Sequence, residues 1–123
     1  MAISEINHQG KKIIFVDYSA LRKKQEMIDG ALEAKAYFLN MPEKNILVLF
    51  DYTNTYLSSE FVKVAKESRE ELYKIKTFRS AALGVTGIKK ILAKGYNALR
   101  SKGEGVQLFD NKSEALNYLV ADS

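Results

Sequence analysis

The stretch NILVLFDY, residues 45–52, decides the fold class of this chain. Its apolar residues from Ile46 to Phe50 are consecutive, so the strand that they predict carries apolar side chains on both of its faces. A strand of this kind is typical of the centre of a parallel sheet that helices cover on two sides. The run therefore predicts an α/β protein.

A second apolar run, residues 13–16 in KKIIFVDYS, predicts a neighbouring strand that ends at Asp17. The preceding ISEINHQG alternates weakly, and with Gly10 at the turn it pairs back as an edge hairpin. Between the two runs, apolar residues at three- and four-residue steps predict a helix from Ala20 to Asn40 that Pro42 closes. The expected buried stripe of this helix is Met27, Ile28, Ala31, Leu32, Lys35, Phe38 and Leu39.

The remaining chain alternates helices and strands in the same way. Ser58 or Ser59 is expected to cap a helix, FRSAALGV (78–85) to form a strand, and Thr86 to cap the next helix. GVQLFD (105–110) predicts the last strand, and Asn111 with Glu114 predicts the start of a final helix. The expected stripe of the first of these three helices is Phe61, Ala65, Ser68, Leu72 and Ile75. The order predicts one domain, residues 1–123, with a single-layer, mostly parallel sheet of four to five strands flanked by about four helices.

The amino-acid composition excludes several classes of function. The net charge of +4 comes from 19 basic and 15 acidic residues, and the two signs are interspersed along the predicted helices. This distribution is typical of solvated helix faces and not of a nucleic-acid surface. The absence of cysteine excludes disulfides, thiolate catalysis and cysteine-ligated metals, and the single His8 is expected to be a solvated loop residue. With no export signal and no membrane span in the sequence, we expect a cytoplasmic location, and no cofactor is expected.

Polar residues follow each predicted strand, and in a parallel sheet these positions meet at one edge, where ligands bind. One interpretation is catalytic, with Asp51 as a phosphoryl-accepting nucleophile and Thr86 binding the phosphoryl group. That chemistry needs a second carboxylate and a late lysine, but Thr53 lies two residues after Asp51, and VQLFD supplies no lysine. We therefore expect Asp17, Asp51 and Asp110 to bond turn N–H groups, and no enzyme activity, with Asp-based phosphatase chemistry as the lesser alternative.

The stretch GVTGIKK, residues 84–90, allows two interpretations. Free N–H groups at a helix start, flexible glycines and two lysines favour an anion site. The stretch lacks both the Gly-Lys-Ser/Thr ending of a phosphate-binding loop and the three-glycine dinucleotide fingerprint, so a simple strand-to-helix junction is the stronger prediction. The residues that would hold an anion or other ligand are Gly84, Thr86, Gly87, Lys89 and Lys90.

The loop DYTNTYLSSE, residues 51–60, supplies the remaining candidates. A phosphate on Ser58 or Ser59 would add negative charge at a helix start and would act as a switch, although each serine is also an ordinary helix cap. The candidate interface residues in this loop are Asp51, Tyr52, Asn54 and Tyr56.

Four stretches together resemble the SpoIIAA-like, STAS/SEC14-type family of small bacterial domains over nearly the whole chain: GKKIIFVDYSAL, ILVLFDYTNTYLSSEFV, AALGVTGIKKI and VQLFDNKSEALNYL. The resemblance implies a four-to-five-stranded α/β sheet and a role in regulation or binding. In the anti-sigma-factor antagonists among these relatives, a serine of an Asp-Ser-Ser-Gly stretch at a helix start is phosphorylated by a partner kinase. Ser58 and Ser59 match those serines, with Leu57 in place of the aspartate and Glu60 in place of the glycine.

These patterns lead to two functional hypotheses. The leading one is a non-enzymatic regulatory or protein-interaction domain with a protein partner of unknown identity. The alternative is a module that binds a small anionic or lipid-like ligand at the carboxyl ends of the strands, since the SEC14-type resemblance implies an apolar ligand. The sequence leaves the oligomeric state open.

Overall fold

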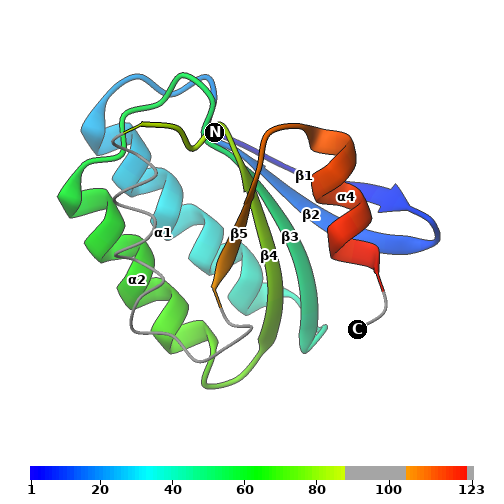
Figure 1. Cartoon of the computed structure of the whole chain (residues 1–123). Coiled ribbons are helices and arrows are strands. Elements are labelled where there is room, and N and C mark those ends of the chain that lie inside the picture. Colours follow the sequence, from blue (N-terminus) through cyan, green and yellow to red (C-terminus); the bar gives the residue numbers. More distant parts are fainter. Residues whose placement is uncertain (88–104, 122–123) are drawn as a thin grey trace.

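The computed structural model describes residues 1–87 and 105–121 and contains a five-stranded sheet in the order β1-β2-β3-β4-β5 (Figure 1). β1 is antiparallel to β2, and the other neighbours are parallel. The strands are β1 (Ala2–His8), β2 (Lys11–Asp17), β3 (Asn45–Asp51), β4 (Thr77–Leu83) and β5 (Val106–Phe109). The predicted α/β class is therefore confirmed, with a mixed sheet.

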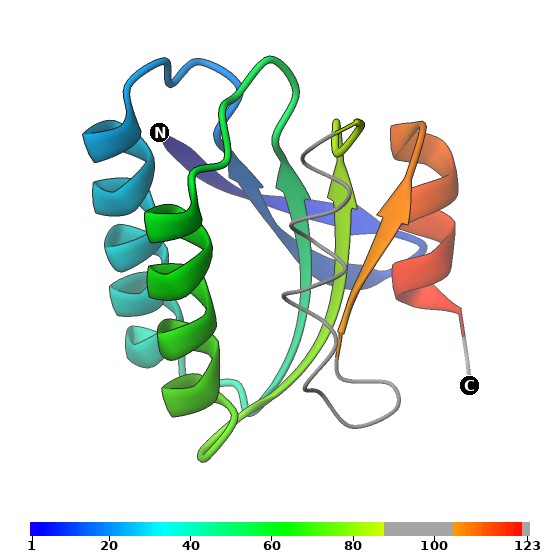
Figure 2. The same ribbon diagram turned by 60° about the vertical axis from the view of Figure 1, so that its left-hand side comes forward.

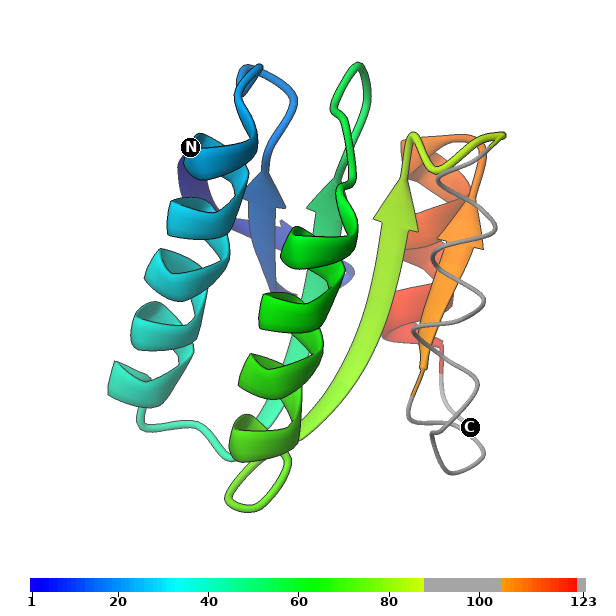
Figure 3. The same ribbon diagram turned by 90° about the vertical axis from the view of Figure 1, so that its left-hand side faces the viewer.

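Three helices cover the described part of this sheet. They are α1 (Lys24–Asn40), α2 (Ser59–Leu72) and α4 (Lys112–Val120). α1 and α2 lie side by side on one face, and α4 lies on the other (Figure 3). The helix predicted after Thr86 falls in residues 88–104, outside the described residues. No helix of the described ranges is long and apolar enough to cross a membrane.

The predicted edge hairpin is confirmed. Gln9 and Gly10 both have positive φ, +52° and +78°, as a two-residue type I′ turn requires. The pairing runs without interruption from His8↔Lys11 to Ala2↔Asp17. The expectation for His8 was wrong: it ends β1, is partly buried, and its Nε2 lies 3.0 Å from Oδ1 of Asn117 on α4. The hairpin therefore contacts α4 near its turn.

Two hydrophobic clusters explain why β3 is apolar on both faces. Ile46 and Val48 face α1 and α2, whereas Leu49 belongs to the cluster beneath α4. Burying each such side chain contributes roughly 1.5–3 kcal/mol. The first cluster also contains Ile14, Val16, Met27, Phe38, Phe61 and Leu72, and the second contains Ile13, Ala81, Leu83, Ala115, Leu119 and Val120.

α1 begins four residues later than predicted. Leu21 N donates to Tyr18 O at 2.9 Å, and Ser19 N donates to the Asp17 carboxylate at 2.9 Å. These bonds form turns, so the segment between β2 and Lys24 does not continue the helical pattern.

The predicted buried stripe of α1 was too wide, and that of α2 was too long. Leu32 and Leu39 are 49% and 46% exposed, because the side of α1 that packs on the sheet and α2 is filled by other residues. Those buried residues are Met27, Gly30, Ala31, Ala34 and Phe38. Ile75 is 57% exposed because α2 ends at Leu72 and leaves it in the following turn.

Candidate functional site

The carboxyl ends of β2, β3, β4 and β5 lie at one edge of the sheet, as the parallel order requires (Figure 3). Backbone bonds continue the ladder beyond the strands: Tyr18 N donates to Asp51 O, and Tyr52 N donates to Leu83 O, both at 2.9 Å. These hydrogen bonds therefore fix the first residues of the loops that follow β2 and β3.

Asp17 and Asp51 are direct neighbours on adjacent strands. Oδ1 of Asp17 accepts from Ser19 N at 2.9 Å. Oδ1 of Asp51 accepts from both the amide and the hydroxyl of Thr53, at 2.9 and 2.6 Å. Both carboxylates thus bond turn groups, as the non-catalytic interpretation expected. Within residues 1–87 and 105–121, no three His, Cys, Asp or Glu side chains gather in a way that could hold a metal ion.

The glycines of the GVTG turn differ in their surroundings. Gly84 has φ +76°, and a Cβ there would lie 2.4 Å from Thr53 N, so this position must be glycine for the β4 turn to pack on the loop after β3. Gly87 has φ +57°, and a Cβ there would meet nothing within 4 Å. Thr86 and Gly87 are exposed, while Lys89 and Lys90 lie outside the described residues.

The loop between β3 and α2 is held by its own hydrogen bonds. The amide and the hydroxyl of Thr55 both donate to Tyr52 O, at 3.1 and 2.6 Å, and Asn54 adopts φ +61°. Tyr52 turns inward and stacks on Tyr18 with ring centroids 5.0 Å apart, whereas Tyr56 is 69% exposed. Of the two candidate tyrosines, Tyr56 is the one available to a partner.

The two candidate serines have different environments. Ser58 is only 3% exposed, and its Oγ accepts from Phe61 N at 3.0 Å, which confirms it as the N-cap of α2. Ser59 is exposed as the first helical residue, and its hydroxyl donates to Oε2 of Glu60 at 3.3 Å. A modifying enzyme could therefore reach Ser59 in the folded chain but not Ser58.

Charges next to Ser59 are balanced. Backbone hydrogen bonding at the start of α2, followed by the nearby Lys24 ammonium, lowers the pKa of the Glu60 carboxyl below its ordinary value. Nζ of Lys24 lies 3.6 Å from Oε1 of Glu60, which links the first turns of α1 and α2. A phosphate on Ser59 would meet both the Glu60 carboxylate and the amino end of the helix, which favours negative charge.

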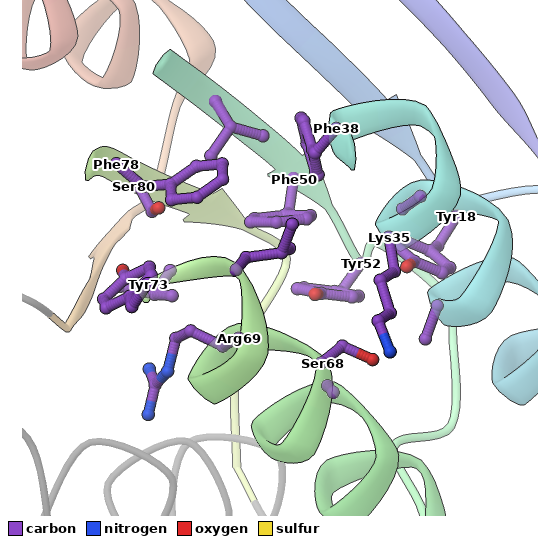
Figure 4. A pocket seen from close by; sticks show the side chains of 16 residues that line it. Tyr18, Lys35, Phe38, Phe50, Tyr52, Ser68, Arg69, Tyr73, Phe78 and Ser80 are labelled. Atoms are coloured by element: carbon purple, nitrogen blue, oxygen red, sulfur yellow. The ribbon is translucent and has the colours of Figure 1, made fainter. Parts of the chain in front are cut away.

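Sequence reasoning missed a narrow cavity between α1, α2 and the sheet (Figure 4). It has a volume of about 60 Å³, and aromatic rings line it together with polar groups. The labelled residues in Figure 4 are Tyr18, Lys35, Phe38, Phe50, Tyr52, Ser68, Arg69, Tyr73, Phe78 and Ser80. In the sequence, the cavity is indicated only by Val48, Phe50 and Tyr52, which alternate along the chain and therefore lie on one face of the strand and its continuation.

A second cavity of about 50 Å³ shares Phe50, Tyr52, Ala65 and Val106 with the first. It extends toward the carboxyl ends of the strands, where the described residues that line it have apolar side chains: Leu57, Phe61, Val62, Ala82, Val85 and Leu108. Small-molecule pockets usually measure roughly 300–1,000 Å³, so each cavity holds only a few water-sized groups as it stands.

A larger cavity of about 260 Å³ lies at the opposite edge, where β2 and β3 begin. Lys12 and Glu43 form an ion pair beside it, and their hydrogen bond raises the pKa of Lys12 and lowers that of Glu43. The strand register starts only at Ile13↔Leu47, so the first residues of the two strands line this cavity without pairing with each other.

Comparison of the chain with protein-family models, with curated proteins and with solved structures gave no match.

Proposed function

We propose that this chain is a non-enzymatic regulatory or protein-interaction domain of the SpoIIAA-like type, whose partner binds at the loop between β3 and α2. The observation that carries the proposal is the exposure of Tyr56 on a loop that is already ordered by hydrogen bonds. Tyrosine is enriched among the residues that dominate protein interfaces. An ordered loop loses little conformational entropy when a partner binds, which favours affinity.

Ser59 is the proposed point of regulation. It is exposed three residues after Tyr56, and a phosphate there would add nearly two negative charges beside the proposed contact. Ser58 serves the fold as the helix cap. The regulatory role is thereby assigned to one of the two serines that match the family's phosphorylated position.

A pull-down from the source cell's lysate tests the proposal with three baits: wild type, Tyr56→Ser and Leu39→Ser. Leu39 is the matched control, because it is also an exposed large apolar residue but lies on α1. We expect a partner that the wild type and Leu39→Ser retain and that Tyr56→Ser loses. Equal recovery on all three baits, or no retained protein, would argue against a partner at this loop.

The second candidate function is binding of a small anionic or lipid-like ligand. The apolar walls of the cavity lined by Leu57, Phe61 and Val85 favour it, because they reach the strand ends where Thr86 and Gly87 are exposed. At about 50 Å³ the cavity must widen to admit a fatty-acid chain. We expect a fatty acid to raise the melting temperature of the wild type and not of Ala65→Phe, which fills both cavities. No shift with the wild type would count against this function.

A further inference from the structure

β1 is a regular edge strand at one end of the sheet. Its seven residues pair one-for-one with β2, without a bulge, and they include neither proline nor lysine. Proteins usually protect exposed edges with such residues or with bulges, since an unprotected edge can pair with another strand. The edge of β1 has no bulge, proline or lysine, and Glu5 is the one carboxylate on the strand.

The hairpin geometry identifies the backbone groups that face outward. In a two-residue type I′ hairpin the residues flanking the turn, here His8 and Lys11, form a hydrogen-bonded pair, and such pairs then alternate along the ladder. The N–H and C=O groups of Ile3, Glu5 and Asn7 therefore point away from β2. The side chains of these three residues share one sheet face, and Ile3 packs with the cluster beneath α1.

The side of α1 next to this edge is acidic. Gly30 faces Met1, whose Sδ would lie 3.0 Å from a Cβ at position 30, so α1 runs beside the start of β1 (Figure 2). Glu33 follows three residues after Gly30, on the same side of the helix, and Asp29 lies one turn before Glu33. Both carboxylates are exposed, on a chain whose net charge is +4.

Glu5 adds a third carboxylate on the strand itself. Its Oε1 lies 3.7 Å from Nζ of Lys12, which also forms an ion pair with Glu43. A strand added to β1 would direct alternate side chains to this acidic face. Lysine or arginine at those positions would complement the three carboxylates, and a second copy of β1 would instead bring like charges together.

We propose that the β1 edge accepts an extended segment of a partner protein, with Lys or Arg at alternate positions, by strand addition. This surface is separate from the loop that carries Tyr56, so the inference stands independently of the proposed function.

The probe is a capped heptapeptide of sequence Thr-Lys-Thr-Lys-Thr-Lys-Thr, added to isotope-labelled full-length protein at low salt. We expect amide exchange at Ile3, Glu5 and Asn7 to slow by about tenfold at saturation, because their N–H groups gain partners. Exchange at Ser4 and Ile6, which already bond β2, is expected to stay unchanged. Glu5→Gln combined with Glu33→Gln should weaken binding by about two- to fivefold.

Two further comparisons make the test decisive. Asn7→Pro removes one outward N–H, leaves the bonds to β2 in place and should abolish binding. Glu67→Gln on α2 is the control for the loss of an exposed carboxylate away from this edge and should bind as the wild type does. The proposal is overturned if the peptide fails to bind at millimolar concentration or binds without slowing exchange at the three amides. It is overturned equally if the glutamate analogue of the peptide binds as well, or if the three amides become protected by concentrating the protein alone.

Discussion

Gly84 lies directly against the backbone of Thr53, and a Cβ atom at position 84 would stand 2.4 Å from the Thr53 amide nitrogen. The turn after β4 thus packs on the turn in which Asp51 bonds Thr53. Gly84→Ala should disturb both turns, because it combines a positive φ with this overlap. We expect the free energy of unfolding to fall by about 2–5 kcal/mol, measured by urea titration.

Gly87→Ala is the matched control for that substitution. Its φ is also positive, at +57°, but a Cβ would meet nothing within 4 Å. A loss of only about 1–2 kcal/mol is expected from the backbone conformation alone. Equal losses in the two variants would show that the contact with Thr53 does not constrain position 84.

Ser58 and Ser59 should respond differently to substitution by alanine. Ser58→Ala removes the oxygen that accepts from Phe61 N, and we expect it to lower the free energy of unfolding by about 1 kcal/mol. Ser59→Ala leaves the cap in place and should change stability by less than about 0.5 kcal/mol. A larger effect of Ser59→Ala in chemical denaturation would contradict the assignment of the cap.

The Lys12–Glu43 ion pair predicts a defined pH dependence of stability. The Lys12 ammonium, through its hydrogen bond, holds the pKa of Glu43 below its ordinary 4.5. The pair therefore stabilises the fold above that pH, and the contribution is lost as the pH falls through the lowered pKa. The pKa of Lys12 is raised above 10.5, so the contribution is complete below that value and is lost as the pH rises through the raised pKa.

A double-mutant cycle with Lys12→Gln and Glu43→Gln isolates this pair from the neighbouring Glu5. We expect a coupling free energy at neutral pH that disappears once Glu43 is protonated in the folded state. A coupling that is unchanged between neutral and strongly acidic pH would contradict the electrostatic origin of the interaction.

Lys76 should be a stabilising residue despite its charge. It is only 9% exposed, and its Nζ donates to Met41 O at 2.8 Å and to Glu43 O at 2.6 Å. Lys76→Met keeps the length of the side chain but leaves these carbonyls without their donor, so we expect a loss of about 2–4 kcal/mol in thermal or urea unfolding. The exposed Lys74→Met should change stability little, and similar losses at both positions would refute the role of Lys76.

Local sequence signals predicted much of the fold. Gly10 marked the hairpin turn, the run from Ile46 to Phe50 marked a strand covered on both faces, and Asn111 marked the start of α4, where its Oδ1 accepts from Glu114 N at 2.9 Å. Each of these features depends on neighbours in the chain. The spacing of apolar residues alone could not predict which residues of α1 are buried, because that depends on how the helix packs against the sheet and against α2.

In the candidate site, too, local sequence predicted some features, whereas others depend on tertiary packing. The sequence placed two serines and two tyrosines in one loop, but only tertiary packing distinguishes buried Ser58 from exposed Ser59 and inward Tyr52 from outward Tyr56. The hydrogen bond from Lys76 to Met41 O joins residues 35 positions apart, and no local sequence pattern predicts it. The acidic residues of α1 could not be linked to an edge strand from the sequence, because only the folded structure places β1 beside this helix.

A partner site at the loop of Tyr56 is tested by photo-crosslinking in the source cell with p-benzoylphenylalanine in place of Tyr56, compared with the same group in place of Leu39. Both side chains are exposed, 69% at Tyr56 and 46% at Leu39, so a crosslinker at either position is open to chance contacts. We expect one discrete crosslinked partner from position 56 that is absent from position 39 and whose yield changes with Ser59→Asp. No crosslink at position 56, or the same products from both positions, would contradict a partner site at this loop.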